Sequence, residues 1–232
     1  MITCLKFLRH NTICRSLTAL GLVLALISLT SSTLAQSPTP PAKDPNTTTT
    51  PPGDAEMMKQ MMALGRPGEN HKLLAGLAGS WTFVVKMWAN PADPKAPPTE
   101  SPGSAVRRET MDGRFFIADF MGVVPMPAAD GKMKDYEFRG TSFEGYDNVK
   151  KKFVTSWIDN MGTGILNSEG TYDSATKTFT YTGEYEPMPG MKCKIRQVLK
   201  IVDADHHNLE WYEDRGAGET KTMEIKYARR KK

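Results

Sequence analysis

FEGYDNVKKKFVTSWIDNMGTG, residues 143–164, holds two strand-like segments with a polar turn between them and a glycine-rich turn at the end. Side chains of a β-strand point alternately to its two faces. In the second segment, one face would carry Phe153, Thr155, Trp157 and Asp159, and the other Val154, Ser156 and Ile158. A large aromatic residue and a carboxylate therefore share a face. Two interpretations stay open: the pair lines an interior pocket, or Asp159 only caps the turn that follows the strand.

Similar short segments continue on both sides of this stretch. Ten candidate strands are found, at residues 80–88, 104–111, 114–121, 138–146, 151–159, 164–171, 178–185, 192–202, 209–213 and 222–229. Turn signals such as Asp112-Gly113 and Asp147-Asn148 separate neighbours, and no helical pattern long enough for a crossover lies between them. We therefore predict an all-β fold: an antiparallel, up-and-down barrel of about ten strands, in which closure removes exposed edges.

The first and last segments alternate most regularly. One face of the first carries Trp81, Phe83, Val85 and Met87, and one face of the last carries Met223, Ile225, Tyr227 and Arg229. Arg229 thus falls in the inward phase, where a guanidinium needs a partner, and the ring of Trp81 is a suitable one. We expect Trp81 and Arg229 to meet where the barrel closes.

The N-terminal residues differ in composition from the rest of the chain. Three basic residues and no acidic ones accompany an apolar run, and small residues follow it around Ala35. This order is typical of a secretory signal peptide, so we expect cleavage of residues 1–35 and a periplasmic or extracellular protein; an uncleaved anchor is the alternative. Residues 36–53 are rich in Pro and Thr and should form a disordered linker.

A short methionine-rich helix, residues 54–68, should separate this linker from the barrel domain, residues 69–232. Asp54 is the expected N-cap, and Gly65 lies near the expected end. Four methionines share one stripe at helical spacing: Met57, Met58, Met61 and Met62. We expect the stripe to rest on the barrel; a thioether site for Cu(I) is the alternative.

Composition and motifs exclude several functional classes. Three of the 30 Lys and Arg residues lie in the predicted signal peptide and all 26 Asp and Glu residues follow it, so the mature domain lacks the charge signature of nucleic-acid binding. After cleavage only Cys193 remains, which excludes an internal disulfide. Residues 203–207 could gather a metal ion but also suit a polar hairpin. We expect no metal or cofactor; heme would need an interior histidine, and no candidate strand contains one.

Several segments together resemble the domain of unknown function 1579 family of exported bacterial proteins. They are HKLLAGLAGSW, GRFFIADFMG, GYDNVKKKFVTSWIDNMGTG, SEGTYD and MEIKYARR, and the resemblance covers about residues 71–231. The resemblance implies a lipocalin-like, or calycin, barrel, with Gly79-Ser80-Trp81 as its Gly-x-Trp start and Arg229 as its late arginine. It implies no established reaction, and it suggests ligand binding only by analogy of architecture.

The leading functional hypothesis is a barrel that holds a small apolar or amphipathic molecule. The candidate wall residues are Trp157, Asp159, Gln197 and Tyr227. Proline-rich links at residues 90–103 and 122–135 should be long loops, the first lying over the mouth. Two alternatives stay open: an enzyme that uses Asp159 or Glu213 as an acid–base group, and a cell-envelope interaction module with a filled barrel. No residue is assigned a catalytic role, and no segment after the signal peptide is long enough to span a membrane.

Overall fold

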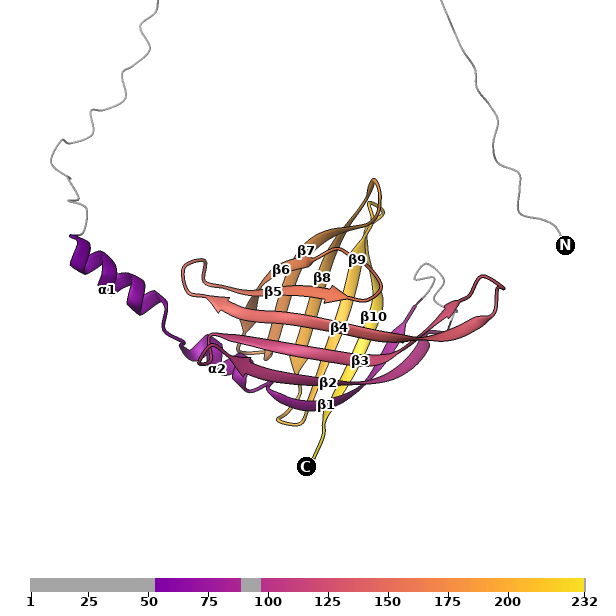
Figure 1. Cartoon of the computed structure of the whole chain (residues 1–232), viewed down its shortest axis with the longest axis horizontal. Helices are drawn as coiled ribbons and strands as arrows, with labels where there is room; N and C mark the ends of the chain where they lie inside the picture. Colours follow the sequence, from indigo (N-terminus) through magenta and orange to yellow (C-terminus); the bar gives the residue numbers. More distant parts are fainter. Residues whose placement is uncertain (1–52, 89–96, 232) are drawn as a thin grey trace, which may run out of the picture. The chain divides into compact units, whose positions relative to one another are not determined.

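The computed structural model describes residues 53–88 and 97–231; the predicted signal peptide and nearly all of the linker lie outside them. Within the described residues, two helices precede ten strands (Figure 1). The elements are α1 (Asp54–Leu64), α2 (Glu69–Ala75), β1 (Gly79–Met87), β2 (Thr99–Thr110), β3 (Phe115–Pro127), β4 (Met133–Asp147), β5 (Lys152–Asp159), β6 (Leu166–Asp173), β7 (Thr178–Met188), β8 (Met191–Ile201), β9 (His206–Asp214) and β10 (Glu219–Arg229). No helix in these two ranges has both the length and the apolar composition needed to cross a membrane.

The described strands form a closed antiparallel barrel. Each strand pairs with the next one along the chain, and β1 also pairs with β10. The closing pair runs from Trp81 opposite Arg229 to Met87 opposite Met223. The prediction of an all-β, up-and-down barrel of about ten strands is confirmed.

Period-two alternation decides which side chains face the interior. In β1, Trp81 is 3% exposed, whereas its neighbour Thr82 is exposed. In β5, Phe153 is 2% exposed and Ile158 is 49% exposed, so the inward set is the one that also contains Trp157 and Asp159. The barrel therefore receives both an aromatic ring and a carboxylate from this strand.

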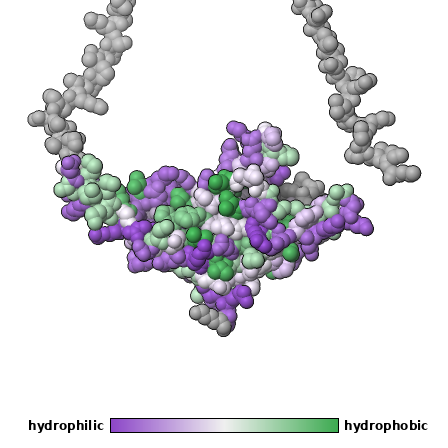
Figure 2. Space-filling model, viewed as in Figure 1, coloured by the Kyte–Doolittle hydropathy of each residue, from purple (hydrophilic) through white to green (hydrophobic). Residues whose placement is uncertain are grey.

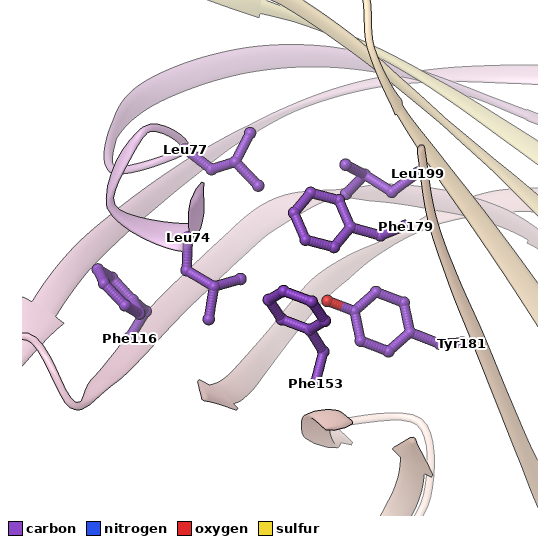
Figure 3. Packing of buried hydrophobic residues seen from close by; sticks show 7 residues of the cluster. All are labelled: Leu74, Leu77, Phe116, Phe153, Phe179, Tyr181 and Leu199. Carbon is purple, nitrogen blue, oxygen red and sulfur yellow. The ribbon is translucent and has the colours of Figure 1, made fainter. Parts of the chain in front are cut away.

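One end of the barrel, called the proximal end here, is filled by apolar side chains. Seven buried residues pack there: Leu74, Leu77, Phe116, Phe153, Phe179, Tyr181 and Leu199 (Figure 3). Leu74 comes from α2 and Leu77 from the turn after it, and both point into the group of aromatic rings. The helix thus closes this end, because it supplies the apolar contacts that water would otherwise replace. The opposite end, which carries the β3–β4 and β9–β10 hairpins, is called the distal end.

The prediction of a long loop at residues 122–135 is wrong. β3 and β4 pair through most of it, as far as Pro127 opposite Met133. β2 accompanies β3 only as far as Gly122, so beyond that residue the two strands form a ribbon that projects from the barrel (Figure 1). Pro125 and Pro127 fit in this ribbon because a free strand edge has no neighbour that needs the missing N–H.

The other proline-rich link is shorter than predicted. β2 begins at Thr99, so residues 99–103 belong to the barrel wall and do not form a loop over the mouth. Residues 90–96 of the same predicted loop lie outside the described residues. Pro102 lies one position beyond the first β2–β3 pair, Gly103 opposite Gly122, where a strand tolerates a residue without an N–H.

Two expectations for α1 are also wrong. Asp54 is the first helical residue, and the N-cap is Gly53. The methionine stripe does not rest on the barrel, because its four side chains are 46–61% exposed. Among the described residues, α1 is attached to the barrel domain at its C-terminal end, where Asn148 Nδ2 donates to the carbonyl oxygen of Leu64 at 2.7 Å. The helix begins at Asp54, as predicted, and ends at Leu64, four residues before the predicted end of its segment.

Candidate functional site

The distal end of the barrel carries inward-facing aromatic rings that remain partly exposed. Phe120, Phe138 and Trp157 form a group, called the distal aromatic group here. The ring centroid of Trp157 lies 5.1 Å from that of Phe120 and 6.2 Å from that of Phe138. All three are half-buried, in contrast to the proximal rings. The distal half of the interior therefore combines apolar surface with access to solvent.

Trp157 and Asp159 are joined by a hydrogen bond. The indole Nε1 of Trp157 donates to Asp159 Oδ2 at 2.7 Å. The other oxygen, Oδ1, accepts from the backbone N–H of Met161 at 2.9 Å. Asp159 thus caps the turn, as the second interpretation expects, and it also fixes the orientation of an interior ring.

Gly140 makes room for this ring. It lies opposite Asp159 in the β4–β5 pairing. A Cβ atom at Gly140 would lie 2.4 Å from atoms Cη2 and Cζ2 of Trp157, which is closer than non-bonded atoms approach. The large ring on β5 therefore depends on a missing side chain on β4.

A second tryptophan–carboxylate pair lies on β9. Glu213 Oε1 accepts hydrogen bonds from Trp211 Nε1 and from the hydroxyl of Tyr185, both at 3.1 Å. Glu213 Oε2 accepts from Arg215 Nη2 at 2.6 Å. Burial and the neighbouring Glu213 raise the pKa of Tyr185, so its hydroxyl stays protonated and donates. Each oxygen of both carboxylates already has a donor, which gives no support to acid–base catalysis by Asp159 or Glu213.

A buried ion pair lies inside the barrel. Arg107 Nη2 and Glu144 Oε1 are 2.7 Å apart, and their side chains are 9% and 10% exposed. Ser142 Oγ donates to the same Glu144 oxygen at 2.7 Å. The other terminal nitrogen, Arg107 Nη1, is buried and has no hydrogen-bond partner among the described residues. A buried charged donor without a partner is costly, so this nitrogen marks a place where a polar group can bind.

His207 is a second interior residue with an unpartnered nitrogen. It is 3% exposed, and its Nδ1 has no hydrogen-bond partner in the described part of the chain. Its ring stacks on Tyr227 at 4.3 Å and meets the edge of Trp81 at the same distance. Burial, and then the positive charges of Arg107 and Arg229, lower the pKa of His207 to about 3. The imidazole is therefore neutral at ordinary pH.

Arg107 and His207 line one interior cavity. Its volume is about 20 Å³, which is room for one water-sized group. The lining residues are Trp81, Ala105, Arg107, Ala118, Phe120, Leu199, His207 and Tyr227. Phe120 belongs both to this lining and to the distal aromatic group, so it connects the cavity with the distal half of the barrel.

The four predicted wall residues all face the interior but do not form one cluster. Trp157 and Asp159 lie at the distal end, and Tyr227 lies at the cavity. Gln197 lies between Tyr181 and Trp211 in the strand register, and its Nε2 donates to Ser168 Oγ at 3.4 Å. The sequence therefore predicted one residue pair at the distal end and one residue of the cavity lining, but it did not predict the polar residues inside the barrel.

Sequence reasoning missed Arg107, Glu144 and His207. The statement that no strand carries a histidine is wrong, because β9 begins at His206, three residues earlier than predicted. His207 shares the inward phase of Leu209 and Trp211, and this alternation is the signal that could have found it. Arg107 likewise shares the phase of Ala105.

The polar hairpin between β8 and β9 does not bring together its four candidate metal ligands, Asp203, Asp205, His206 and His207. His206 lies outside and bonds Asp203 through Nδ1 at 2.9 Å, whereas His207 points into the barrel. No group of three or more His, Cys, Asp or Glu side chains suited to a metal ion occurs among the residues that the structure describes.

At the closing pair of strands, Arg229 lies over Trp81, with its Cζ atom 4.1 Å from the ring centroid. Its Nη1 donates to the carbonyl oxygen of Ala78 at 2.7 Å, and Nη2 donates to that of Gly76 at 3.0 Å. The guanidinium thus also bonds the turn that joins α2 to β1. These contacts connect the end of α2 to the closing strands, β1 and β10.

Comparison with known proteins gives a family but no activity. A family model described as a protein of unknown function, DUF1579, matches residues 66–229, which is more than half of the chain and includes all ten strands of the barrel. No curated protein matches the chain. The chain belongs to the DUF1579 family of proteins of unknown function.

Proposed function

We propose that this protein is a binding protein that holds a small apolar or amphipathic molecule in the distal half of its barrel. The observation that carries the proposal is the partial exposure of the distal aromatic group, although its three rings face the interior. Binding sites for small molecules are mostly apolar and aromatic, with a few well-placed polar groups. Asp159, Glu213 and the Arg107–Glu144 pair supply such groups.

The orientation of Trp157 supports the same proposal. Its indole N–H is already bonded to Asp159, so a ligand that packs on the exposed part of the ring would leave no polar atom of Trp157 without a partner. Aromatic rings bury a large apolar area at a small cost in conformational entropy. A ligand that packs on this ring would also change its fluorescence.

Titration with the neutral dye N-phenyl-1-naphthylamine tests the proposal. We expect saturable binding, quenching of tryptophan emission, and at least about tenfold weaker binding by Trp157→Ala. Ile158→Ala is the matched control, because Ile158 is the next residue on the same strand and points outward at 49% exposure. Absence of saturation, or equal weakening by both substitutions, would contradict ligand binding in the barrel.

We also propose that the protein is exported. The basic start, the apolar run and the small residues around Ala35 support this proposal. Expression in a Gram-negative host, followed by fractionation and intact-mass measurement, should give a periplasmic chain that begins near Gln36. A full-length chain retained in the cytoplasm would contradict export.

A further inference from the structure

We propose that the ligand carries a neutral oxygen, a hydroxyl or a carbonyl, and that this oxygen occupies the interior cavity and bonds Arg107. This inference rests on the proposed function and specifies the chemical class of the ligand. It follows from two residues that line one small cavity and that each carry a buried polar atom without a hydrogen-bond partner among the described residues.

The two atoms are Arg107 Nη1 and His207 Nδ1. Both are buried, neither has a hydrogen-bond partner among the described residues, and both residues line the cavity. A hydroxyl group can accept a hydrogen bond from Arg107 and donate one to a ring nitrogen of His207 that carries no proton. A carbonyl oxygen can accept from Arg107. Either group would satisfy a donor whose isolation is costly.

The surrounding charges favour a neutral group over a carboxylate. The charge of Arg107 is already balanced by Glu144, 2.7 Å away. A ligand carboxylate at Arg107 would place a second negative charge near Glu144 and would lose its hydration. The cavity also has room for one water-sized group, and a carboxylate brings two oxygens.

The apolar part of the ligand would extend toward the distal end. Phe120 lines the cavity and packs against Trp157 with their ring centroids 5.1 Å apart. The ring centroid of Phe120 also lies 6.2 Å from that of Phe83. These rings form a continuous apolar surface from the cavity to the distal aromatic group, along which the body of an alcohol or ketone can pack.

The test uses three ligands of similar shape: 3-phenylpropan-1-ol, butylbenzene and 3-phenylpropanoate. Their affinities are measured by displacement of N-phenyl-1-naphthylamine from the wild-type protein and from the double variant Arg107→Met/Glu144→Gln. The double variant keeps the buried charge balanced, because removal of one partner alone would leave an unpaired charge. Arg108→Met/Asp119→Asn is the control, since this neighbouring ion pair is exposed.

We expect the Arg107/Glu144 variant to bind the alcohol at least about tenfold more weakly and butylbenzene within about twofold of wild type. The control variant should bind both ligands with the affinity of the wild-type protein. Equal effects on the alcohol and butylbenzene, or no effect on either, would show that Arg107 does not bind the hydroxyl group and would overturn the inference. A larger loss for 3-phenylpropanoate would overturn the neutral class. If the wild-type protein binds none of the three ligands and no dye, the proposed function itself fails.

A second measurement covers the case in which the double variant does not fold. The carbonyl stretching frequency of 4-phenylbutan-2-one is recorded when it is bound to the wild-type protein. A hydrogen bond from a guanidinium should lower this frequency below its value in an alkane solvent. A frequency equal to that in the alkane would overturn the inference without any variant.

Discussion

The proximal and distal ends of the barrel are built from the same alternating strands but differ in burial. At the proximal end, Phe116 and Phe179 are 0% exposed and pack with Leu74 from α2 (Figure 3). At the distal end, Phe138 and Trp157 face the interior as well, yet both are half-buried. The difference shows that strand alternation decides which way a side chain points, whereas burial depends on what covers the end of the barrel.

The face of the protein that Figure 2 shows does not repeat this division. The visible face in Figure 2 mixes hydrophilic residues with small, separate hydrophobic patches. Exposed apolar side chains such as Val106, Phe143 and Ile158 lie on the outward phase of their strands. The contrast between the two ends is therefore a property of the interior, where substitutions can test it.

The largest expected difference is in the stability cost of removing a ring. Phe179→Ala should lower the free energy of unfolding by about 3–5 kcal/mol, because it leaves a cavity in a closed core. Phe138→Ala should lower it by about 1 kcal/mol, because the site is already partly hydrated. Urea denaturation followed by circular dichroism measures both. Equal losses would show that the two ends are equally well packed.

Two interior glycines sharpen the comparison. A Cβ atom at Gly170 would lie 2.5 Å from the backbone oxygen of Thr180, which cannot easily move. Gly170→Ala should therefore cost about 2–3 kcal/mol of stability. At Gly140 the obstacle is the ring of the half-buried Trp157, so Gly140→Ala should cost about 1 kcal/mol and shift the tryptophan emission. In thermal denaturation, Gly170→Ala should lose more stability than Gly140→Ala. A larger loss for Gly140→Ala would contradict the tighter packing that we assign to the surroundings of Gly170.

His207 should make the stability of the barrel depend on pH. The pKa of this group is lowered to about 3 by burial, from an ordinary value of 6.5, so its contribution is complete above pH 6.5 and is lost as the pH falls toward 3. Between pH 6 and pH 5 the free energy of unfolding should fall by about 1 kcal/mol per pH unit from this group.

His207→Gln should remove that part of the pH dependence. His71, whose pKa is also lowered mainly by burial, contributes in the same direction, so His71→Gln is the parallel variant. Urea denaturation at several pH values above 4.5 keeps the measurement clear of most carboxylate titration. An unchanged slope in His207→Gln would show that the imidazole is not held neutral inside the barrel.

The smallest expected effect is at the distal carboxylate. Asp159→Ala removes the hydrogen bonds to Trp157 Nε1 and to the N–H of Met161, and we expect a loss of about 1 kcal/mol at this partly exposed site. Tryptophan emission should broaden as the ring loses its fixed orientation. Asp159→Asn keeps an acceptor and should retain more of the stability. A loss as large as that of Phe179→Ala would mean that Asp159 is a core residue and not part of a binding surface.

Sequence alone determined the strand order, the inward face of β1 and β10, and the family resemblance, because alternation and turn signals depend on residues adjacent in the chain. It could not place the start of β9, since the segment around His206 has the composition of a turn and becomes strand only by pairing with β8 and β10.

Only the tertiary structure decided that Arg107 lies inside the barrel. A buried arginine is stable only with a partner, and its partner Glu144 is 37 residues away in the chain. The same holds for the exposure of the distal rings, which depends on the absence of a covering element like α2 at that end of the described structure. The alternation of residues within a strand decides to which face a side chain points. Contacts between residues that are distant in the chain decide burial and charge pairing, and therefore the position of the candidate site.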